Sequence, residues 1–143
     1  MSGFLLDTNC ISGIVRPKPE PRVMEWVDAS DESLLYLSVL TLAEIRKAVA
    51  GLPQGARRKR LEIWLEVELE ARFPGRIVKI DWAIASRWGL LAAEAERQGR
   101  SLGIIDGLLA ATALHHNLII VSRNTTDFTG TPVQILNPWE ASR

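Results

Sequence analysis

Five short apolar segments constrain the fold of this chain more than any other feature of its sequence. They occupy residues 4–6, 34–37, 77–80, 118–121 and 133–136. Most of them are continuous runs instead of alternating apolar and polar residues. Continuous runs are typical of strands that are buried on both faces, as in a parallel sheet covered by helices.

The stretches between these segments have helical patterns. We expect helices over residues 7–15, 20–29, 38–50, 54–73, 81–98 and 103–116. Glycines at helix ends and a proline in a first turn support several of these boundaries. Strands that alternate with helices predict a three-layer α/β/α sandwich with a mostly parallel, five-stranded sheet. Because the sequence contains no linker and no internal repeat, we expect a single domain over residues 1–143.

The composition excludes several classes of protein. Hydrophobic residues make up 47% of the chain and charged residues 24%, which is typical of a globular domain. The only cysteine, Cys10, rules out an intrachain disulfide and favours a reducing, cytoplasmic location. No apolar run approaches the roughly 20 residues that span a bilayer, and the first residues do not resemble a signal peptide. The 17 basic and 17 acidic residues cancel, so any site for a polyanion must be local.

Four acidic residues mark a candidate site. Asp7 directly follows the first apolar segment, and Asp106 is the only charged residue between Leu102 and Leu114. Glu44 and Asp127 follow the second and fourth segments. Each acid alone has a plainer explanation, such as a helix N-cap for Asp7 or an exposed helix edge for Asp106. In right-handed β-α-β units, however, strand C-termini and helix N-termini meet at one edge of the sheet, so all four carboxylates map to that edge.

Converging carboxylates repel one another and require a cation. Oxygen ligands favour Mg²⁺ or Mn²⁺. Asp7 and Asp106 are the first choices as direct ligands, whereas Glu44 and Asp127 could bind directly, bind through water or position the attacking water. Neighbouring hydroxyls and amides could orient the carboxylates; the alternative is that they are caps and turn formers, which we favour for Asn9 and Ser38. The six residues are Thr8, Asn9, Ser38, Thr41, Ser122 and Asn124.

Four motifs resemble those of a known family. They are Leu5-Leu6-Asp7-Thr8-Asn9, Ser38-x-x-Thr41-x-x-Glu44, Ile105-Asp106-Gly-Leu-Leu-Ala-Ala-Thr-Ala113 and Val121-Ser-Arg-Asn-Thr-Thr-Asp127-Phe128. In this order and spacing they resemble the PIN domain, and most closely the VapC toxins of the FitB-like branch. The Trp88-Gly89 and Asn137-Pro138-Trp139 segments fit that branch too. Gly13 departs from it, because the branch often has a glutamate there.

The resemblance implies the toxin of a type II toxin–antitoxin module. Such a toxin is a Mg²⁺-dependent endoribonuclease, is neutralised by a VapB/FitA-like antitoxin that binds DNA, and forms a homodimer within a larger assembly. By motif match, Asp7, Glu44, Asp106 and Asp127 are the catalytic and metal-binding residues. Hydrolysis of RNA by a metal-activated water would leave a 5′-phosphate and a 3′-hydroxyl.

Basic and apolar residues suggest where RNA and antitoxin bind. Arg16, Arg46 and Arg123 are candidate contacts for the RNA, although for each arginine alone solvated surface is the favoured explanation. The helical pair over residues 39–73 carries more apolar side chains than the sheet needs, so we expect a groove for an antitoxin peptide there.

Two other functions are alternatives to that of a metal-dependent ribonuclease. A PIN-like interaction module without turnover, acting through a protein partner, is the main alternative. A metal-free ribonuclease with two catalytic histidines is disfavoured, because His115 and His116 are adjacent and diverge on a helix.

Overall fold

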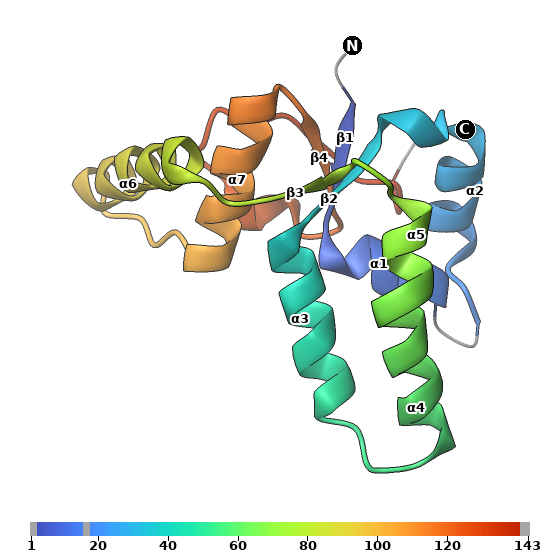
Figure 1. Ribbon diagram of the computed structural model, residues 1–143. Helices are drawn as coiled ribbons and strands as arrows, with labels where there is room; N and C mark the ends of the chain where they lie inside the picture. Colours follow the sequence, from blue (N-terminus) through green and yellow to red (C-terminus); the bar gives the residue numbers. More distant parts are fainter. Residues whose placement is uncertain (1–2, 16–17, 141–143) are drawn as a thin grey trace.

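A parallel sheet of five strands forms the centre of the computed structural model, which describes residues 3–15 and 18–140. The strands are β1 (Phe4–Leu6), β2 (Leu35–Ser38), β3 (Ile77–Val78), β4 (Ile119–Val121) and β5 (Ile135–Leu136). Their order is β3-β2-β1-β4-β5, and every pairing is parallel. The predicted α/β fold is therefore confirmed, with a sheet that is parallel throughout its described pairings (Figure 1).

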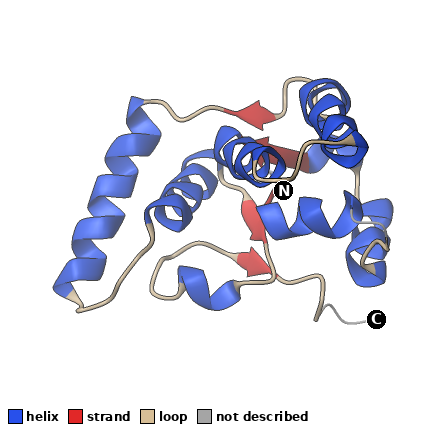
Figure 2. Cartoon of the chain, turned by 90° about the horizontal axis from the view of Figure 1, so that it is seen from below, coloured by secondary structure: helices blue, strands red, loops and turns tan. Residues whose placement is uncertain are grey.

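The helices fall into two groups with the strands between them (Figure 2). Their bounds are α1 Thr8–Val15, α2 Pro21–Ala29, α3 Val39–Ala50, α4 Ala56–Ile63, α5 Glu70–Arg72, α6 Trp82–Arg97 and α7 Ile104–His116. None of the helices in the described ranges is both long and apolar enough to cross a membrane.

Each face of the sheet has its own hydrophobic core, because successive strand residues point to opposite faces. Leu6 of β1 and Val121 of β4 belong to the core that also includes residues of α1, α2 and α3. Leu5 and Ile120 belong to the other core, with residues of α7. Burial on both faces explains why these strands read as continuous apolar runs.

The structure corrects some of the predicted boundaries. The helix expected over residues 54–73 begins at Ala56 and contains a π-helical segment, η2 (Trp64–Leu69). Two 3₁₀ turns, η1 (Glu32–Leu34) and η3 (Thr125–Phe128), were not predicted. Both edge strands have only two residues, fewer than their apolar segments. An edge strand has one pairing partner, so its ladder ends where that partner diverges.

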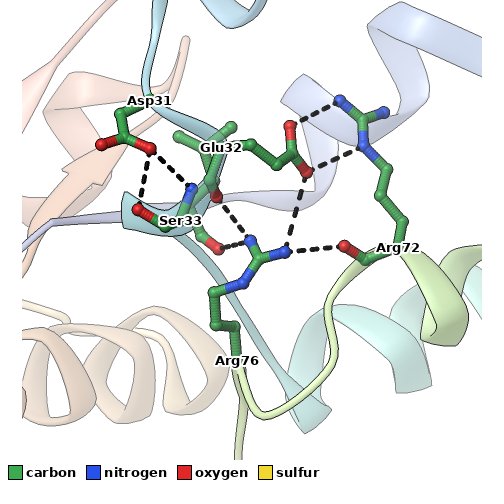
Figure 3. Close-up of polar contacts among 6 residues, drawn as sticks. Asp31, Glu32, Ser33, Arg72 and Arg76 are labelled. Atoms are coloured by element: carbon green, nitrogen blue, oxygen red, sulfur yellow. Dashed lines mark hydrogen bonds and ion pairs between the residues drawn. The ribbon is translucent and has the colours of Figure 1, made fainter.

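Arginine contacts tie the long helical hairpin (α3 to α5) to the sheet. Arg76 precedes β3 and donates hydrogen bonds to the carbonyls of Glu32 (2.6 Å), Leu35 (2.6 Å) and Arg72 (2.7 Å). Arg72, at the end of the hairpin, forms an ion pair of 3.1 Å with Glu32 (Figure 3). These contacts anchor the returning limb of the hairpin whose first limb carries Glu44.

Helices α6 and α7 pack closely where α7 begins. A Cβ atom at Gly107 would lie 2.8 Å from Trp88 Cδ1 and 2.9 Å from Trp88 Nε1. Glycine at position 107 therefore lets the indole ring of α6 rest against the first turns of α7. This turn of α7 carries Asp106.

Replacing Gly107 with alanine tests this packing. Alanine normally stabilises a helix interior by about 0.5–1 kcal/mol relative to glycine. At position 107 we expect the opposite sign, a loss of about 1–3 kcal/mol in the free energy of unfolding, because the new methyl group overpacks the contact with Trp88. Gly89→Ala is the matched control, since Gly89 is also in a helix and no described atom beyond its chain neighbours and its own helix backbone lies within 4 Å of its Cβ position. Denaturant unfolding measures both, and equal stabilisation by the two variants would contradict the packing argument.

Candidate active site

Four acidic side chains from four separate segments of the chain line one cleft of about 590 Å³. Asp7 links β1 to α1, Glu44 is on α3, Asp106 is in the first turn of α7, and Asp127 is in η3. The order of strands and helices in the sequence predicts this convergence at the C-terminal edge of the strands. The other lining residues are Thr8, Asn9, Ser12, Gly13, Arg123, Asn124 and Trp139.

Asp7 is the most enclosed of the four acids, with 7% of its surface exposed. Its backbone N–H donates to the carbonyl of Val121 (2.9 Å), which continues the β1–β4 ladder to the cleft. Its carboxylate accepts hydrogen bonds from the N–H of Thr8 (2.7 Å) and the hydroxyl of Ser122 (2.8 Å). A usual N-cap accepts from the second or third helical residue, whereas Asp7 accepts from the first. Asp7 occupies the N-cap position of α1, since its carbonyl accepts from the N–H groups of Cys10 (3.0 Å) and Ile11 (3.4 Å), but its carboxylate does not make the usual capping bond.

A short hydrogen-bond network supports the carboxylate of Asp7. Ser122, which is fully buried, accepts from the side-chain amide of Asn9 (3.3 Å) and the backbone N–H of Asn124 (3.0 Å) while it donates to Asp7. The side-chain oxygen of Asn9 accepts from the N–H of Arg123 (3.2 Å). The loop after β4 and the first turn of α1 are thereby joined at the cleft.

Glu44 is linked to the same turn. The hydroxyl of Thr8 donates to Glu44 Oε1, while the backbone N–H of Thr8 donates to Asp7. One residue therefore orients two of the four carboxylates.

The carboxylates perturb one another. Burial raises the pKa of Asp106 to about 6, and the negative charges of Asp127, Asp7 and Glu44 add to the effect. Burial also raises the pKa of Asp7, and Glu44 and Asp127 contribute; the hydrogen bonds from Ser122 and Thr8 oppose the rise. Both shifts have the direction expected for partly buried acids that lie close to one another, and no positive charge is among their causes.

Several predicted residues lie elsewhere or have other contacts. Ser38 is the N-cap of α3, where its hydroxyl accepts from the N–H of Leu40 (3.0 Å). The hydroxyl of Thr41 is buried and has no hydrogen-bond partner in the described part of the chain. Neither contacts an acid of the cleft through a hydrogen bond. Asn9, for which we favoured capping, instead bridges to Ser122 and Arg123.

The three candidate RNA-binding arginines differ in where they lie relative to the cleft. Arg123 lines the cleft, as expected of a contact for RNA. Arg46 points to the helical hairpin instead and forms an ion pair of 2.9 Å with Glu66, so it is not part of the cleft. Its position two residues after Glu44 turns it to another face of α3. Arg16 lies outside the described residues.

The cleft also contains residues that the prediction missed. Ser12 lies one helical turn after Thr8, and that spacing could have identified it. Trp139 reaches the cleft from beyond β5, about 130 residues from Asp7 in the chain. No spacing rule indicates such a contact, although the Asn137-Pro138-Trp139 segment is one of those that carry the family resemblance.

The donor set of the cleft suits a hard divalent cation. As the side chains stand, no three His, Cys, Asp or Glu residues within 3–15 and 18–140 are arranged to hold a metal ion. The cleft nevertheless offers four carboxylates, oxygen donors that Mg²⁺ and Mn²⁺ prefer. A bound cation would offset the repulsion that adds to the effect of burial in raising the pKa values of Asp7 and Asp106. The residues therefore fit such an ion.

A parallel α/β sheet with acids gathered at its C-terminal edge is the arrangement of a PIN domain. The sequence model of the PIN domain matches residues 4–131, so the chain belongs to this family. The resemblance proposed from its motifs is confirmed.

Comparison with individual proteins narrows the family to the VapC and FitB toxins. The chain is 37% identical over 137 residues to the VapC ribonuclease Y4jK of Sinorhizobium fredii, covering 96% of this chain and 98% of the relative. It is 38% identical over 136 residues to the toxin FitB of Neisseria gonorrhoeae, covering 95% and 98%. The crystal structure of FitAcB from Neisseria gonorrhoeae superposes with a TM-score of 0.91 at 37% identity, covering 96% of this chain and 99% of that one.

The raised pKa of Asp106 predicts how stability depends on pH when metal is absent. Because the pKa is about 6 in the folded chain and 3.8 in the ordinary state, the folded chain binds more protons between about pH 4 and pH 6. The free energy of unfolding should therefore fall as pH rises through this window. Asp106→Asn removes the effect and should be more stable than the wild type at pH 7 by about 1 kcal/mol, an amount reduced by solvent screening.

Thermal unfolding in EDTA from pH 4 to pH 8 measures this difference. The advantage of Asp106→Asn should shrink as the pH falls, since the wild-type carboxyl is then neutral too. Asp28→Asn, at an exposed position of α2, is the control and should show no such trend. A wild type that is more stable than Asp106→Asn at pH 7 and equally stable at pH 4 would contradict the argument.

Proposed function

We propose that this chain is the toxin of a type II toxin–antitoxin module, a cytoplasmic endoribonuclease that depends on Mg²⁺ or Mn²⁺. The observation that carries the proposal is the gathering of four carboxylates in one cleft at the C-terminal edge of the sheet. Relatives that share its length and about a third of its residues are named a VapC ribonuclease and the toxin FitB. The chemistry of the cleft and the names of the relatives support the same activity.

The roles that we assign follow from how each acid is held. Asp7 and Asp106 are the direct metal ligands, since both are perturbed by their neighbours and at least partly shielded from solvent. Glu44 and Asp127 complete the site directly or through water. A bound divalent cation would neutralise charge on the phosphate and lower the pKa of the attacking water.

The remaining chemistry belongs to the side chains of this chain. Ser122 and Thr8 fix the orientation of Asp7 and Glu44 through the hydrogen bonds described above. Asn9 and Asn124 hold Ser122 in place. The guanidinium of Arg123 lies at the wall of the cleft and provides positive charge for the RNA backbone.

The overall reaction is hydrolysis of a phosphodiester. A water oxygen attacks phosphorus, and a carboxylate of the cleft accepts the proton that this water loses. The bond from phosphorus to the 3′-oxygen breaks, and the leaving 3′-oxygen keeps the electron pair and takes up a proton from solvent water. The products carry a 5′-phosphate and a 3′-hydroxyl. The 2′-hydroxyl takes no chemical part, so selection of RNA depends on shape and contacts.

The histidines take no part in this scheme. His115 and His116 are in the last turn of α7, whereas Asp106 is in its first turn. At 1.5 Å per residue, ten residues of helix separate them from the acid by about 15 Å. A two-histidine mechanism in the acid cleft is therefore ruled out by position.

We propose an apolar groove beside the cleft as the docking surface of the antitoxin. It has a volume of about 510 Å³ and lies between α3 and α4, lined by Ile45, Ala48, Val49, Leu52, Leu61 and Trp64, among others. Thr8 and Ser12 line both the groove and the acid cleft. A peptide in the groove would therefore lie next to the acid cleft. Solved structures similar to this chain include toxin–antitoxin complexes.

A homodimer is also part of the proposal. A second depression of about 420 Å³ lies along α6 and is lined by Leu90, Leu91, Leu114 and Pro132, among others. Leu90 is 71% exposed, which is unusual for a large apolar side chain. This surface is where we expect a second copy to pack.

Cleavage assays test the central assignment. We expect the wild type to cleave single-stranded RNA only with Mg²⁺ or Mn²⁺, and Asp7→Asn or Asp106→Asn to reduce the rate at least about 100-fold, the scale on which one charge-stabilising group acts. The same substitutions should relieve the growth arrest that we expect from expressing the toxin alone. Asp28→Asn serves as the control with full activity. Metal-dependent cleavage that survives both active-site substitutions would disprove the mechanism, and a wild type without any cleavage would favour the non-catalytic interaction module.

Two fully buried serines test the role of orientation. Ser122→Ala removes the hydrogen bond to Asp7 and should weaken Mg²⁺ affinity or activity by about 10- to 100-fold. Ser38→Ala removes the N-cap of α3 and should cost about 1 kcal/mol of stability without a comparable effect on Mg²⁺ affinity. Calorimetric titration of Mg²⁺ and thermal unfolding separate the two effects. Equal losses of affinity would show that only general stability was being measured.

Hydrogen exchange tests the antitoxin surface. With the cognate antitoxin bound, amides within residues 39–73 should gain protection, because the groove between α3 and α4 is covered. Amides of α2, which lie outside the groove, provide the internal reference. If protection appears only outside 39–73, the antitoxin binds another surface.

A further inference from the structure

Arg123 and Trp139 form a cation–π pair at the wall of the acid cleft. The guanidinium carbon of Arg123 lies 5.5 Å from the centroid of the Trp139 ring, and both residues line the cleft with the four acids. They come from neighbouring strands of the sheet, since Arg123 follows β4 and Trp139 follows β5. The pair is therefore assembled by the fold and not by one local segment.

The tryptophan is held firmly on its side of the pair. Its ring packs against the hydrophobic core that includes residues of α1 and α2. Its backbone N–H donates to the side chain of Asn137 (2.9 Å), and its carbonyl accepts from the guanidinium of Arg22. A Cβ atom at Gly13 would lie 3.7 Å from Trp139 Cζ2, an ordinary contact, so α1 supports the ring edge.

The arginine is fixed at its backbone and exposed at its side chain. Its N–H donates to Asn9, the residue that also holds Ser122. Its guanidinium contacts the Trp139 ring and forms no hydrogen bond or ion pair with other residues of the described ranges. Within the described ranges its side-chain N–H donors have no partner and are thus available to a ligand.

This arrangement suits an unpaired nucleobase. Bases in single-stranded RNA stack on aromatic rings and on arginine guanidinium planes. A guanidinium that is already held over a tryptophan ring loses less conformational freedom when a base binds beside it, because its position is restricted beforehand. Its N–H edge remains free for a phosphate oxygen, so stacking and charge neutralisation are compatible.

We propose that the Arg123–Trp139 pair is a base-stacking subsite, which takes an unpaired base of the RNA strand close to the scissile phosphate. This inference rests on the proposed ribonuclease function and adds a reason for single-stranded substrates. A base within a duplex is stacked on its neighbours and cannot join the pair. Because every base has a π-face, the subsite selects unpaired structure more than sequence.

Binding measurements with a form that does not cleave provide the test. The Asp7→Asn chain is titrated against a fluorescein-labelled, single-stranded RNA oligonucleotide and against copies in which one nucleotide at a time is abasic. We expect one abasic position to weaken binding roughly tenfold, the scale of one stacked base. In the same background, Arg123→Lys keeps the charge and loses the plane, whereas Trp139→Leu removes the support. Either variant should bind the intact RNA about tenfold more weakly and show no further loss with the abasic copy.

Two controls and a separate readout make the outcomes distinct. Arg97→Lys and Trp82→Leu alter an exposed arginine and an 81% exposed tryptophan on α6, outside the cleft, and should leave RNA binding unchanged. If Arg123→Lys binds intact and abasic RNA as tightly as its parent, Arg123 contacts phosphate alone and the subsite is disproved. An abasic penalty that persists in both variants, or absence of RNA binding, also overturns it. Cleavage by the wild type decides the proposed function independently, since that chain can cleave whether or not the subsite exists.

Discussion

Mutual repulsion among four carboxylates is the interaction on which this site depends. The parallel sheet causes it, because strand C-termini and helix N-termini meet at one edge and bring acids from four elements together. Each acid alone would be unremarkable on a protein surface. Burial and, after it, the charges of the neighbouring acids raise the pKa of Asp106 to about 6 and that of Asp7 above its ordinary value. A divalent cation is therefore the natural complement of the cleft.

The surrounding structure keeps the carboxylates in place despite this repulsion. Asp7 is fixed by the β1–β4 ladder and by the Ser122 network, and Glu44 is reached by the hydroxyl of Thr8. The hairpin that carries Glu44 is anchored to the sheet by Arg72 and Arg76. The position of Asp106 depends on the close packing of Trp88 against Gly107. These contacts stabilise the folded chain and keep the carboxylates close together, although the repulsion among the carboxylates opposes folding when no metal is bound.

Sequence reasoning predicted the elements that depend on local patterns. The five apolar segments and the helix boundaries at Pro21, Asp81 and Asn117 follow from periodicity and capping, and the structure bears them out. The predicted topology then indicated that the four acids lie at the C-terminal edge of the sheet. The features that sequence reasoning did not predict depend on contacts between residues that are distant in the chain. The ion pair of Arg46 with Glu66 and the arrival of Trp139 at the cleft are set by how the hairpin and the C-terminal segment pack. No local pattern encodes such contacts, and the capping role of Ser38 cannot be told from a role beside Glu44 by spacing alone.

The stabilisation of the folded chain by Mg²⁺ tests the central claim most directly. A cation that binds only the folded state should raise the free energy of unfolding by about 2.7 kcal/mol at a hundredfold excess over its dissociation constant. Thermal unfolding of the wild type and of Asp106→Asn across a series of Mg²⁺ concentrations measures this gain. The account predicts a clear, saturable increase for the wild type and a much smaller one for Asp106→Asn. Equal stabilisation of the two proteins would show that Asp106 is not a metal ligand and would contradict the account.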